Sequence, residues 1–279
     1  MTDDLGREVR LKAAPSRMIS LAPSVTEILF ALGLDREIVG VTSTCDYPPQ
    51  AKTKPSVGTS INPDLEKMVS LQPDLIIAAK GIYRPDLAKE MERLHLPFYV
   101  SDPATLDSIF SSIEHLGQLT EKVREGRLLI QQMRSKFDRI RKRVINIPPR
   151  RVLYILWHDP LMTVGPGGFI HELIELAGGQ NIYSKPGAPY TWFSMEEVIL
   201  KDPEVVIFPG ELGESVVQSQ KQIWERRWGM LSAVKEGRLY ITNSDLLHRP
   251  GPRIVQGLEV LARIIHPEVF EDEVQDPHP

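Results

Sequence analysis

The sequence predicts an α/β protein built of two similar lobes, each carrying a parallel sheet. The first observation is a pattern that occurs twice: residues 63–78 read PDLEKMVSLQPDLIIA and residues 193–208 read FSMEEVILKDPEVVIF. With a shift of 130 positions, apolar residues match apolar residues and Pro73 falls on Pro203. Each copy has the pattern of a short amphipathic helix followed by a buried strand. A helix leading into a buried strand is half of a parallel α/β layer, so two copies indicate two lobes.

A second internal match supports the same division. GFIHELIELAGG at 168–179 is similar to TEILFALG at 26–33, with Glu172 on Glu27 and Gly178 on Gly33. The two matches occur in the same order along the chain, as expected for two lobes of common design. The length of 279 residues also fits two domains of ordinary size.

Composition narrows the class of protein. The chain is 42% hydrophobic and 25% charged, which is typical of a globular protein, and its net charge of −4 gives no electrostatic basis for nucleic-acid binding. The single cysteine, Cys45, excludes an internal disulfide and a thiolate metal cluster. No apolar run is long enough for a membrane span, so we expect no membrane insertion.

The first residues lack the apolar core of a signal peptide. We therefore expect a periplasmic or membrane-anchored protein outside the inner membrane if an export signal has been removed, and a cytoplasmic protein if Met1 is the native start.

The first lobe reads as alternating strands and helices. A helix begins after the turn at Ala22–Ser24, with a capping box from Ser24 to Glu27 and Gly33 as its end. Asn62 is the expected N-cap of the first repeat helix, with Pro63 at its first position. The expected strands are 17–21, 38–41, about 75–78 and 97–101, with a further helix at 85–94 and a long loop at 42–62.

From Thr105 to Val144 the apolar spacing stays helical, but forty residues would span about 60 Å, too long for one lobe. We expect a break near Gly117 or Gly126, leaving one long helix between the lobes. The second lobe then has expected strands at 152–157, 204–208 and 238–242, and helices at 194–201, about 222–226 and 252–265. The predicted domains are an N-terminal lobe (1–119), a linking helix (120–147), a C-terminal lobe (148–270) and an acidic tail (271–279).

Candidate binding residues lie after the strands, because ligands of open α/β sheets bind beyond the carboxyl ends of the strands. The loops there are rich in aromatic side chains, which suit a large, flat, partly apolar ligand; the alternative for each ring is packing within its loop. These aromatic residues are Tyr47, Tyr83, Trp157, Tyr190 and Trp192. Asp245 and Arg249, four apart in NSDLLHRPGPR, either pair with each other or contact the ligand.

Other chemistry has little support. His158-Asp159 lacks a hydrolase GxSxG partner, and the scattered histidines have no metal-binding spacing, so no catalytic residue and no metal site are predicted. VGPGG at 164–168 precedes a helix and either cradles an anion or forms a tight turn.

Several of these stretches together resemble a known family. RMISLAPSVTEILFALG, GVTSTCDYPPQA, NPDLEKMVSLQPDLIIA, LAGGQNIY and SDLLHRPGPR are similar to the substrate-binding proteins of ABC importers, in the group that binds vitamin B12, iron-siderophores or haem. The resemblance covers about residues 15–267, and the vitamin B12-binding members match best.

The resemblance implies two Rossmann-like lobes joined by one long helix, with the ligand in a cleft between them. It also implies a monomeric, non-enzymatic protein that has no intrinsic cofactor and delivers cobalamin to an ABC permease dimer. Carried over by motif, the corrinoid contacts are Pro23, Tyr47, Tyr190, Asp245 and Arg249. The docking residues for the permease are Glu66 and Glu196, equivalent acids of the repeat, with Glu197 as the alternative to Glu196.

The chain also departs from the vitamin B12-binding pattern. Ser60 and Ala79 stand where those members have tryptophans, and Tyr190 replaces another; Tyr83, Trp157 and Trp192 are the candidates to compensate. Haem is the first alternative ligand, with Tyr47, Tyr83 or His248 as its axial residue. A ferric siderophore would use Lys80, Arg84 and Arg249. The alternative from another class is a cytoplasmic corrinoid-handling enzyme that uses His158 or Asp245.

Overall fold

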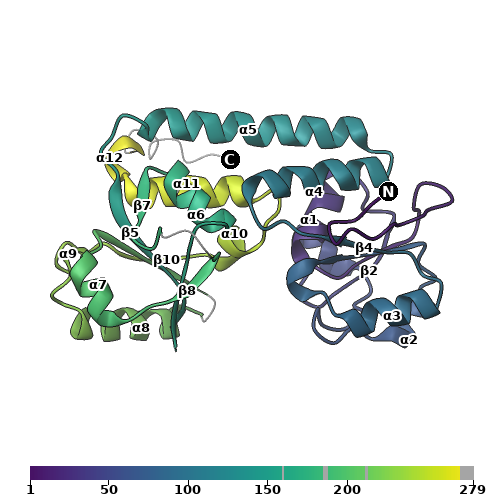
Figure 1. Cartoon of the computed structure of the whole chain (residues 1–279), viewed down its shortest axis with the longest axis horizontal. Helices are drawn as coiled ribbons and strands as arrows, with labels where there is room; N and C mark the ends of the chain where they lie inside the picture. The colour runs from purple at the N-terminus through teal and green to yellow at the C-terminus, as the bar shows by residue number, and fades with distance from the viewer. Residues whose placement is uncertain (159, 185–187, 211–212, 271–279) are drawn as a thin grey trace. The chain divides into compact units, whose positions relative to one another are not determined.

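The computed structural model describes residues 1–158, 160–184, 188–210 and 213–270 and confirms the α/β class. The chain forms two compact units (Figure 1). Unit 1 contains Met1–Met133 and the short segment Pro250–Pro252, and unit 2 contains Arg134–Arg249 and the chain from Arg253 onward. The predicted acidic tail, 271–279, lies outside the described residues.

Unit 1 is built on a four-stranded parallel sheet with the strand order β2-β1-β3-β4. Ile19, Ile76 and Val100, on three of these strands, belong to its core together with Met68 and Met91 from the helices. The elements in chain order are β1 (Met18–Ser20), α1 (Pro23–Ala31), β2 (Ile38–Val41), the 3₁₀ turn η1 (Pro49–Thr53), α2 (Leu65–Ser70), β3 (Leu75–Ala79), the 3₁₀ turn η2 (Lys80–Ile82), α3 (Pro85–Arg93), β4 (Phe98–Ser101) and α4 (Leu106–Leu119).

Two helix starts differ from the sequence prediction. Helix α1 has Ala22 as its N-cap and Pro23 at its first position, so the capping box from Ser24 to Glu27 is wrong. Proline lacks an N–H and has a helical φ, which favours it at the first helical position and places Ser24 inside the first turn. Helix α2 is capped by Asp64 and not by Asn62, because the Asp64 carboxylate accepts the Lys67 backbone N–H at 3.0 Å.

The long helical stretch breaks near Gly117, as predicted. Helix α4 ends at Leu119 and α5 (Val123–Val144) begins after a turn in which the Lys122 N–H donates to the Gly117 carbonyl at 2.7 Å. A Cβ on Gly117 would lie 3.0 Å from the Lys122 carbonyl oxygen, so glycine suits this close approach. Helix α5 has 22 residues, a length of about 33 Å, and the chain passes from unit 1 to unit 2 within it.

Unit 2 has a mixed sheet with the order β10-β9-β5-β6-β8, and β7 also pairs with β5. Strands β7, β5, β9 and β10 are parallel and repeat the strand order of unit 1. The elements are β5 (Arg150–His158), β6 (Leu161–Val164), α6 (Phe169–Leu176), β7 (Gly179–Asn181), β8 (Tyr190–Trp192), α7 (Met195–Lys201), β9 (Val205–Pro209), α8 (Gly213–Arg227), α9 (Ser232–Lys235), β10 (Leu239–Thr242), α10 (Ser244–His248), α11 (Ile254–Ile265) and α12 (Pro267–Phe270).

The antiparallel strands β6 and β8 correct the expectation of purely parallel sheets. The sequence places Tyr190 and Trp192 in a loop, but Tyr190–Trp192 pairs antiparallel with β6, which in turn pairs antiparallel with β5. A stretch of three residues that directly follows Pro189 carries too little periodicity to indicate a strand, and the pairing partner decides its conformation.

Among the described residues, no helix combines the length and the apolar character needed to cross a membrane.

Candidate binding site

The candidate residues of unit 1 lie after three parallel strands. Pro23 comes after β1 as the first residue of α1, and Tyr47 lies in the loop after β2 with 39% of its surface exposed. Strands β1 and β2 are neighbours in the sheet, so these two residues lie at the same sheet edge. Tyr47 therefore offers an aromatic surface where a ligand of this fold class binds.

Tyr83, which comes after β3, is engaged within unit 1. Its ring stacks on Phe98 with centroids 6.4 Å apart and an angle of 24°, and the Arg7 guanidinium carbon lies 5.4 Å from its centroid. The half-buried ring packs against the core of this unit. The structure thus shows a packing role for Tyr83, and its contact with a ligand stays a prediction.

The sheet of unit 2 brings together the two tryptophans of the prediction. Trp157 on β5 pairs with Met162 on β6, and Met162 pairs with Trp192 on β8. Side chains of directly paired residues lie on the same face of a sheet, about 4.5–5.5 Å apart at Cβ. We call Trp157, Met162 and Trp192 the aromatic row.

The two tryptophans of the aromatic row are exposed to solvent, whereas the opposite face of the same strands is packed against the core. Trp157 and Trp192 have 50% and 61% of their surface exposed. Leu161 and Phe193, each one residue from a member of the row, pack on the core of unit 2 instead. Exposed tryptophans on a sheet face that is anchored from behind form a rigid apolar surface.

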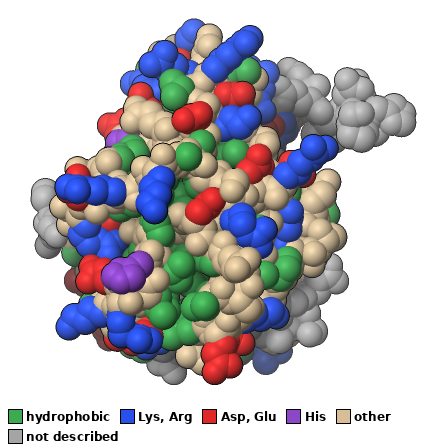
Figure 2. Space-filling model, turned by 90° about the vertical axis from the view of Figure 1, so that its right-hand side faces the viewer, with side chains coloured by type: hydrophobic (Ala, Val, Ile, Leu, Met, Phe, Trp, Pro, Cys, Tyr) green, Lys and Arg blue, Asp and Glu red, His purple; other side chains and the backbone are tan. Residues whose placement is uncertain are grey.

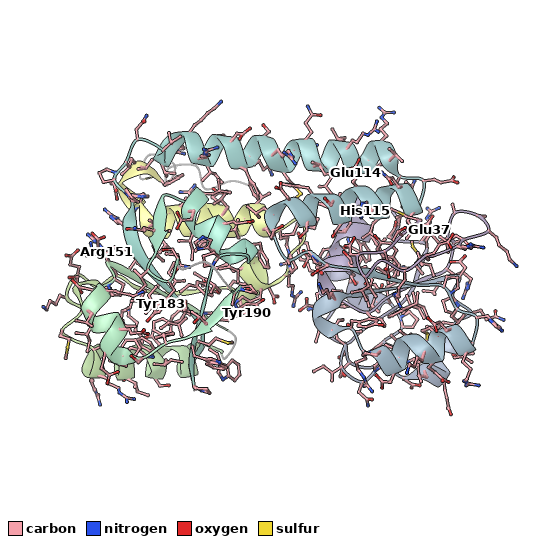
Figure 3. All side chains as sticks on the ribbon, viewed as in Figure 1. Glu37, Glu114, His115, Arg151, Tyr183 and Tyr190 are labelled. Atoms are coloured by element: carbon pink, nitrogen blue, oxygen red, sulfur yellow. The ribbon has the colours of Figure 1, made fainter. Side chains whose placement is uncertain are left out.

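Tyr190 extends this surface. It lies two residues from Trp192 on β8, which places both on one face of the strand, and 53% of its surface is exposed. Figure 3 labels Tyr190 at β8 and Tyr183 in the interior of unit 2. Tyr183 is packed against Phe193, and burial together with the neighbouring Glu197 raises the pKa of its hydroxyl.

Sequence reasoning missed Met162, the middle member of the row. An isolated methionine has no signal of its own, and only the antiparallel pairing of 155–158 with 161–164 places it between the tryptophans. A short turn between two apolar runs was the available sign of a hairpin. His158-Asp159 lies at this turn; the His158 side chain and Asp159 are outside the described residues.

Asp245 and Arg249 pair with each other at the short helix α10. The Asp245 Oδ1 atom lies 2.8 Å from Arg249 Nη2, and the arginine side chain is 15% exposed against 36% for the aspartate. His248, on the same helix, shares a hydrogen bond of 2.8 Å with the hydroxyl of the buried Tyr154. The helix therefore presents a partly neutralised pair, whereas its histidine is engaged with the core strand β5.

The cations of unit 1 are also paired. Lys80 Nζ lies 2.5 Å from Asp102 Oδ2, and this hydrogen bond raises the pKa of Lys80. Arg84 is paired with Asp86, whose pKa is lowered by the arginine. The three cations that a siderophore would use, Lys80, Arg84 and Arg249, thus each have a carboxylate partner.

The two candidate docking acids lie at equivalent helix starts. Glu66 and Glu196 are exposed residues in the first turns of α2 and α7, and the pKa of Glu196 is lowered by hydrogen bonds from its own backbone N–H and from Ser194. Glu197, the alternative to Glu196, instead accepts hydrogen bonds from the Ser194 N–H and the Tyr183 hydroxyl, both at 3.3 Å.

The 164–168 stretch has the geometry of a turn. The Gly165 N–H donates to the Pro189 carbonyl at 2.8 Å, and a Cβ on Gly165 would lie 2.5 Å from the Ala188 carbonyl oxygen. This close packing favours the tight turn over an anion cradle.

The described part of the chain holds no group of three His, Cys, Asp or Glu side chains arranged for a metal ion. On the face drawn in Figure 2, basic and acidic side chains are interspersed around apolar ones.

Comparison with known proteins agrees with the resemblance seen in the motifs. Residues 18–246 match the family described as periplasmic binding protein. A vitamin B12-binding protein of Vibrio cholerae serotype O1 is 32% identical over 243 residues, which are 87% of this chain and 86% of that protein.

Two solved structures extend the comparison. The periplasmic vitamin B12-binding protein of Vibrio cholerae superposes with a TM-score of 0.77 at 30% identity, covering 94% of this chain and 99% of the other. The periplasmic haem-binding protein of Roseiflexus sp. RS-1 has a TM-score of 0.80 at 25% identity, covering 92% of this chain and all of the other.

The family and these relatives are binding proteins, which confirms that the chain is a binding protein and not an enzyme. The matched residues include most of both units. The chain belongs to the periplasmic binding protein family.

Proposed function

We propose that this chain captures a corrinoid such as vitamin B12 and delivers it to an ABC permease. The observation that carries the proposal is the aromatic row, with Trp157 and Trp192 exposed on either side of Met162. Its support from relatives is the vitamin B12-binding protein of Vibrio cholerae, 32% identical over 87% of this chain.

The row suits the chemistry of a corrin ring. The ring is broad and largely apolar on its faces, so indole faces and a thioether bury its surface without needing hydrogen bonds. Each tryptophan can cover about 150–250 Å² of apolar surface. Tyr190 on the same strand widens the platform.

The polar edges of the ligand need a different kind of contact. Asp245 and Arg249, carried over from the family motif, supply an acceptor and a donor at α10, and Tyr47 and Pro23 supply contacts from unit 1. A pair of opposite charges can bond neutral amides at a lower desolvation cost than two isolated charges.

Titration of the protein with cyanocobalamin by calorimetry tests this function. We expect saturable binding with one corrinoid per chain and a dissociation constant of micromolar or tighter, about −8 kcal/mol or better. Absence of binding at high micromolar corrinoid would overturn the corrinoid proposal. Haem titrated in parallel shows whether the site distinguishes the two macrocycles.

Haem is the second candidate, supported by the likeness to the haem-binding protein of Roseiflexus. Of its three possible axial residues, Tyr47 is the most exposed, with 39% of its surface exposed, whereas Tyr83 and His248 are half-buried. Tyr47→Phe should then abolish a haem Soret shift while leaving corrinoid binding within about threefold, since only haem needs the phenolate as ligand.

Delivery requires a partner surface outside the ligand site. Glu66 and Glu196 are exposed at equivalent positions of α2 and α7, and two related acids suit a two-fold symmetric basic partner such as a permease dimer. The proposed compartment is the periplasm or the outer side of the inner membrane, and the proposed state of the binding protein is a monomer.

A further inference from the structure

Three hydroxyl groups gather at the end of β2 in unit 1. Ser60 Oγ and Thr44 Oγ1 lie 3.3 Å and 3.2 Å from Thr42 Oγ1, and 3.3 Å from each other. We call Thr42, Thr44 and Ser60 the hydroxyl triad. It stands in the loop region that also carries Tyr47.

The backbone holds the triad in place. The segment after Pro55 runs beside β2, with the Val57 N–H donating to the Val41 carbonyl and the Ser43 N–H to the Gly58 carbonyl, both at 2.8 Å. Gly58 has φ +91°, and a Cβ there would lie 2.8 Å from the Asn62 carbonyl oxygen. The turn that presents Ser60 is therefore built on a conformation that favours glycine.

The members of the triad differ in burial. Thr42 is 1% exposed and also contacts the Cys45 thiol at 3.1 Å, so its hydroxyl is fully occupied. Thr44 is exposed and Ser60 is half-buried, and among the described residues their hydroxyls bond only within the triad. Two of the three residues of the triad thus reach the surface.

The number of hydrogen-bond donor and acceptor positions on each hydroxyl indicates which ligand groups the triad can bind. Each hydroxyl has one donor and two acceptor positions. In a closed ring of three, every donor is used inside the ring and each oxygen keeps one acceptor position. The outward capacity of Thr44 and Ser60 is therefore for N–H donors.

The surroundings favour a neutral donor. Arg84 donates to the Ile61 carbonyl beside Ser60 at 2.7 Å, and its charge is paired with Asp86. A carboxylate would find no free donor in the ring, whereas an amide –NH₂ group has two N–H donors to offer.

We propose that Thr44 and Ser60 form a subsite that accepts the N–H groups of primary amides on the ligand. The inference rests on the proposed function and refines it, because a corrinoid carries primary amides around its ring whereas haem carries carboxylates. The hydroxyl triad then binds the ring periphery by hydrogen bonding.

The test uses the double variant Thr44→Val/Ser60→Ala, titrated with cyanocobalamin. Loss of two hydrogen bonds to the ligand predicts roughly tenfold weaker binding. Thr44→Ser keeps the hydroxyl and should bind as the wild type does. Ser111→Ala, which removes an exposed hydroxyl bonded to the Asp107 carbonyl within α4, is the matched control.

A second ligand checks the chemistry. Cyanocobalamin with peripheral amides hydrolysed to carboxylates should bind the wild type more weakly, and the double variant should lose part of that discrimination. If the wild type binds cyanocobalamin and the double variant binds it equally well, the subsite is overturned and the proposed function stands. If the wild type binds no corrinoid, both are overturned. Thermal unfolding of each variant shows that an affinity change does not reflect misfolding.

Discussion

The two units have the same arrangement of strands and helices but carry different side chains on their surfaces. With the 130-residue shift, β3 (Leu75–Ala79) coincides with β9 (Val205–Pro209), and the N-caps Asp64 and Ser194 coincide as well. Even the left-handed residues agree, with φ 48° at Gln72 and φ 40° at Asp202.

The agreement extends to contacts made outside the repeat. Asp74 accepts the backbone N–H of Arg17 just before β1, and Glu204 accepts the backbone N–H of Arg151 at the start of β5, both at 2.9 Å. The guanidinium groups of these arginines bond carbonyls in the turn before each acid. Figure 3 labels Arg151 on unit 2.

The difference lies in the segments that leave the strands. Unit 2 inserts β6 and β8 after β5 and so carries the aromatic row, whereas unit 1 has the long 42–62 loop with the hydroxyl triad. A repeated scaffold thus holds an apolar surface in one unit and a polar one in the other.

The largest expected effect concerns the exposed acids that the two units share. Replacing both glutamates, Glu66→Ala/Glu196→Ala, should abolish uptake in a transport assay with the cognate permease, because both of the proposed docking contacts would be lost. Corrinoid affinity should stay within about twofold, since neither residue lies on the aromatic row. A loss of affinity would show that these acids serve the ligand site instead; Glu114→Ala on α4 is a control for removing an exposed acid elsewhere.

Met68 and Val198 occupy equivalent buried positions, so alanine substitutions at these positions compare the two cores. Both are fully buried, each in the core of its unit. Met68→Ala should lower the free energy of unfolding by about 2–5 kcal/mol, and Val198→Ala by less because fewer atoms are removed. Chemical denaturation measures both values. The exposed neighbours Val69 and Ile199 serve as controls: their alanine variants should change stability by about 0.5 kcal/mol or less.

A smaller effect is expected from the equivalent N-caps. Asp64→Ala and Ser194→Ala should each cost about 1 kcal/mol, because each side chain accepts a backbone N–H of the first helical turn. Thermal unfolding should show similar losses for the two. A loss at one position alone would mean that the two helices contribute unequally to their units.

The smallest predicted effect is a loss of stability at acid pH that arises in unit 2 and has no counterpart at the equivalent position of unit 1. Asp202 accepts the Ser232 N–H and hydroxyl, which lowers its folded-state pKa below the ordinary 3.8, whereas its equivalent Gln72 does not titrate. A lowered pKa stabilises the fold above the unfolded value, and this stability is lost as pH falls through the folded value. The wild type should therefore lose more stability below pH 4 than Asp202→Asn does. Equal acid sensitivity of the two proteins in denaturation from pH 6 to pH 2.5 would contradict this assignment.

Much of the fold was predictable because it depends on local pattern. Buried runs such as Ile38–Val41 have the bounds expected from their apolar residues and flanking turns, and Gly33 ends α1 in the left-handed conformation. The helix starts were harder: the choice between Asn62 and Asp64, or between Ala22 and Ser24, depends on where proline fixes the backbone.

The candidate site was predictable as a set of residue types and not as an arrangement. Trp157 and Trp192 stood out as aromatic residues near strand ends, but Met162 joins them only through antiparallel pairing. Ser60 was visible only as a missing tryptophan, and its bonds to Thr42 and Thr44 depend on a turn 16 residues along the chain. Long-range pairing of this kind leaves no periodic signal in one sequence.

The most direct test of corrinoid capture compares cyanocobalamin binding to the wild type, to Trp157→Ala and to Trp192→Ala by calorimetry. We predict saturable binding to the wild type and about tenfold weaker binding to each variant, because each loses the stacking surface of one indole. Ile223→Ala, which truncates an exposed apolar side chain on α8, should bind as the wild type does. Corrinoid affinity unchanged in both tryptophan variants would contradict the central claim that the aromatic row holds the ligand.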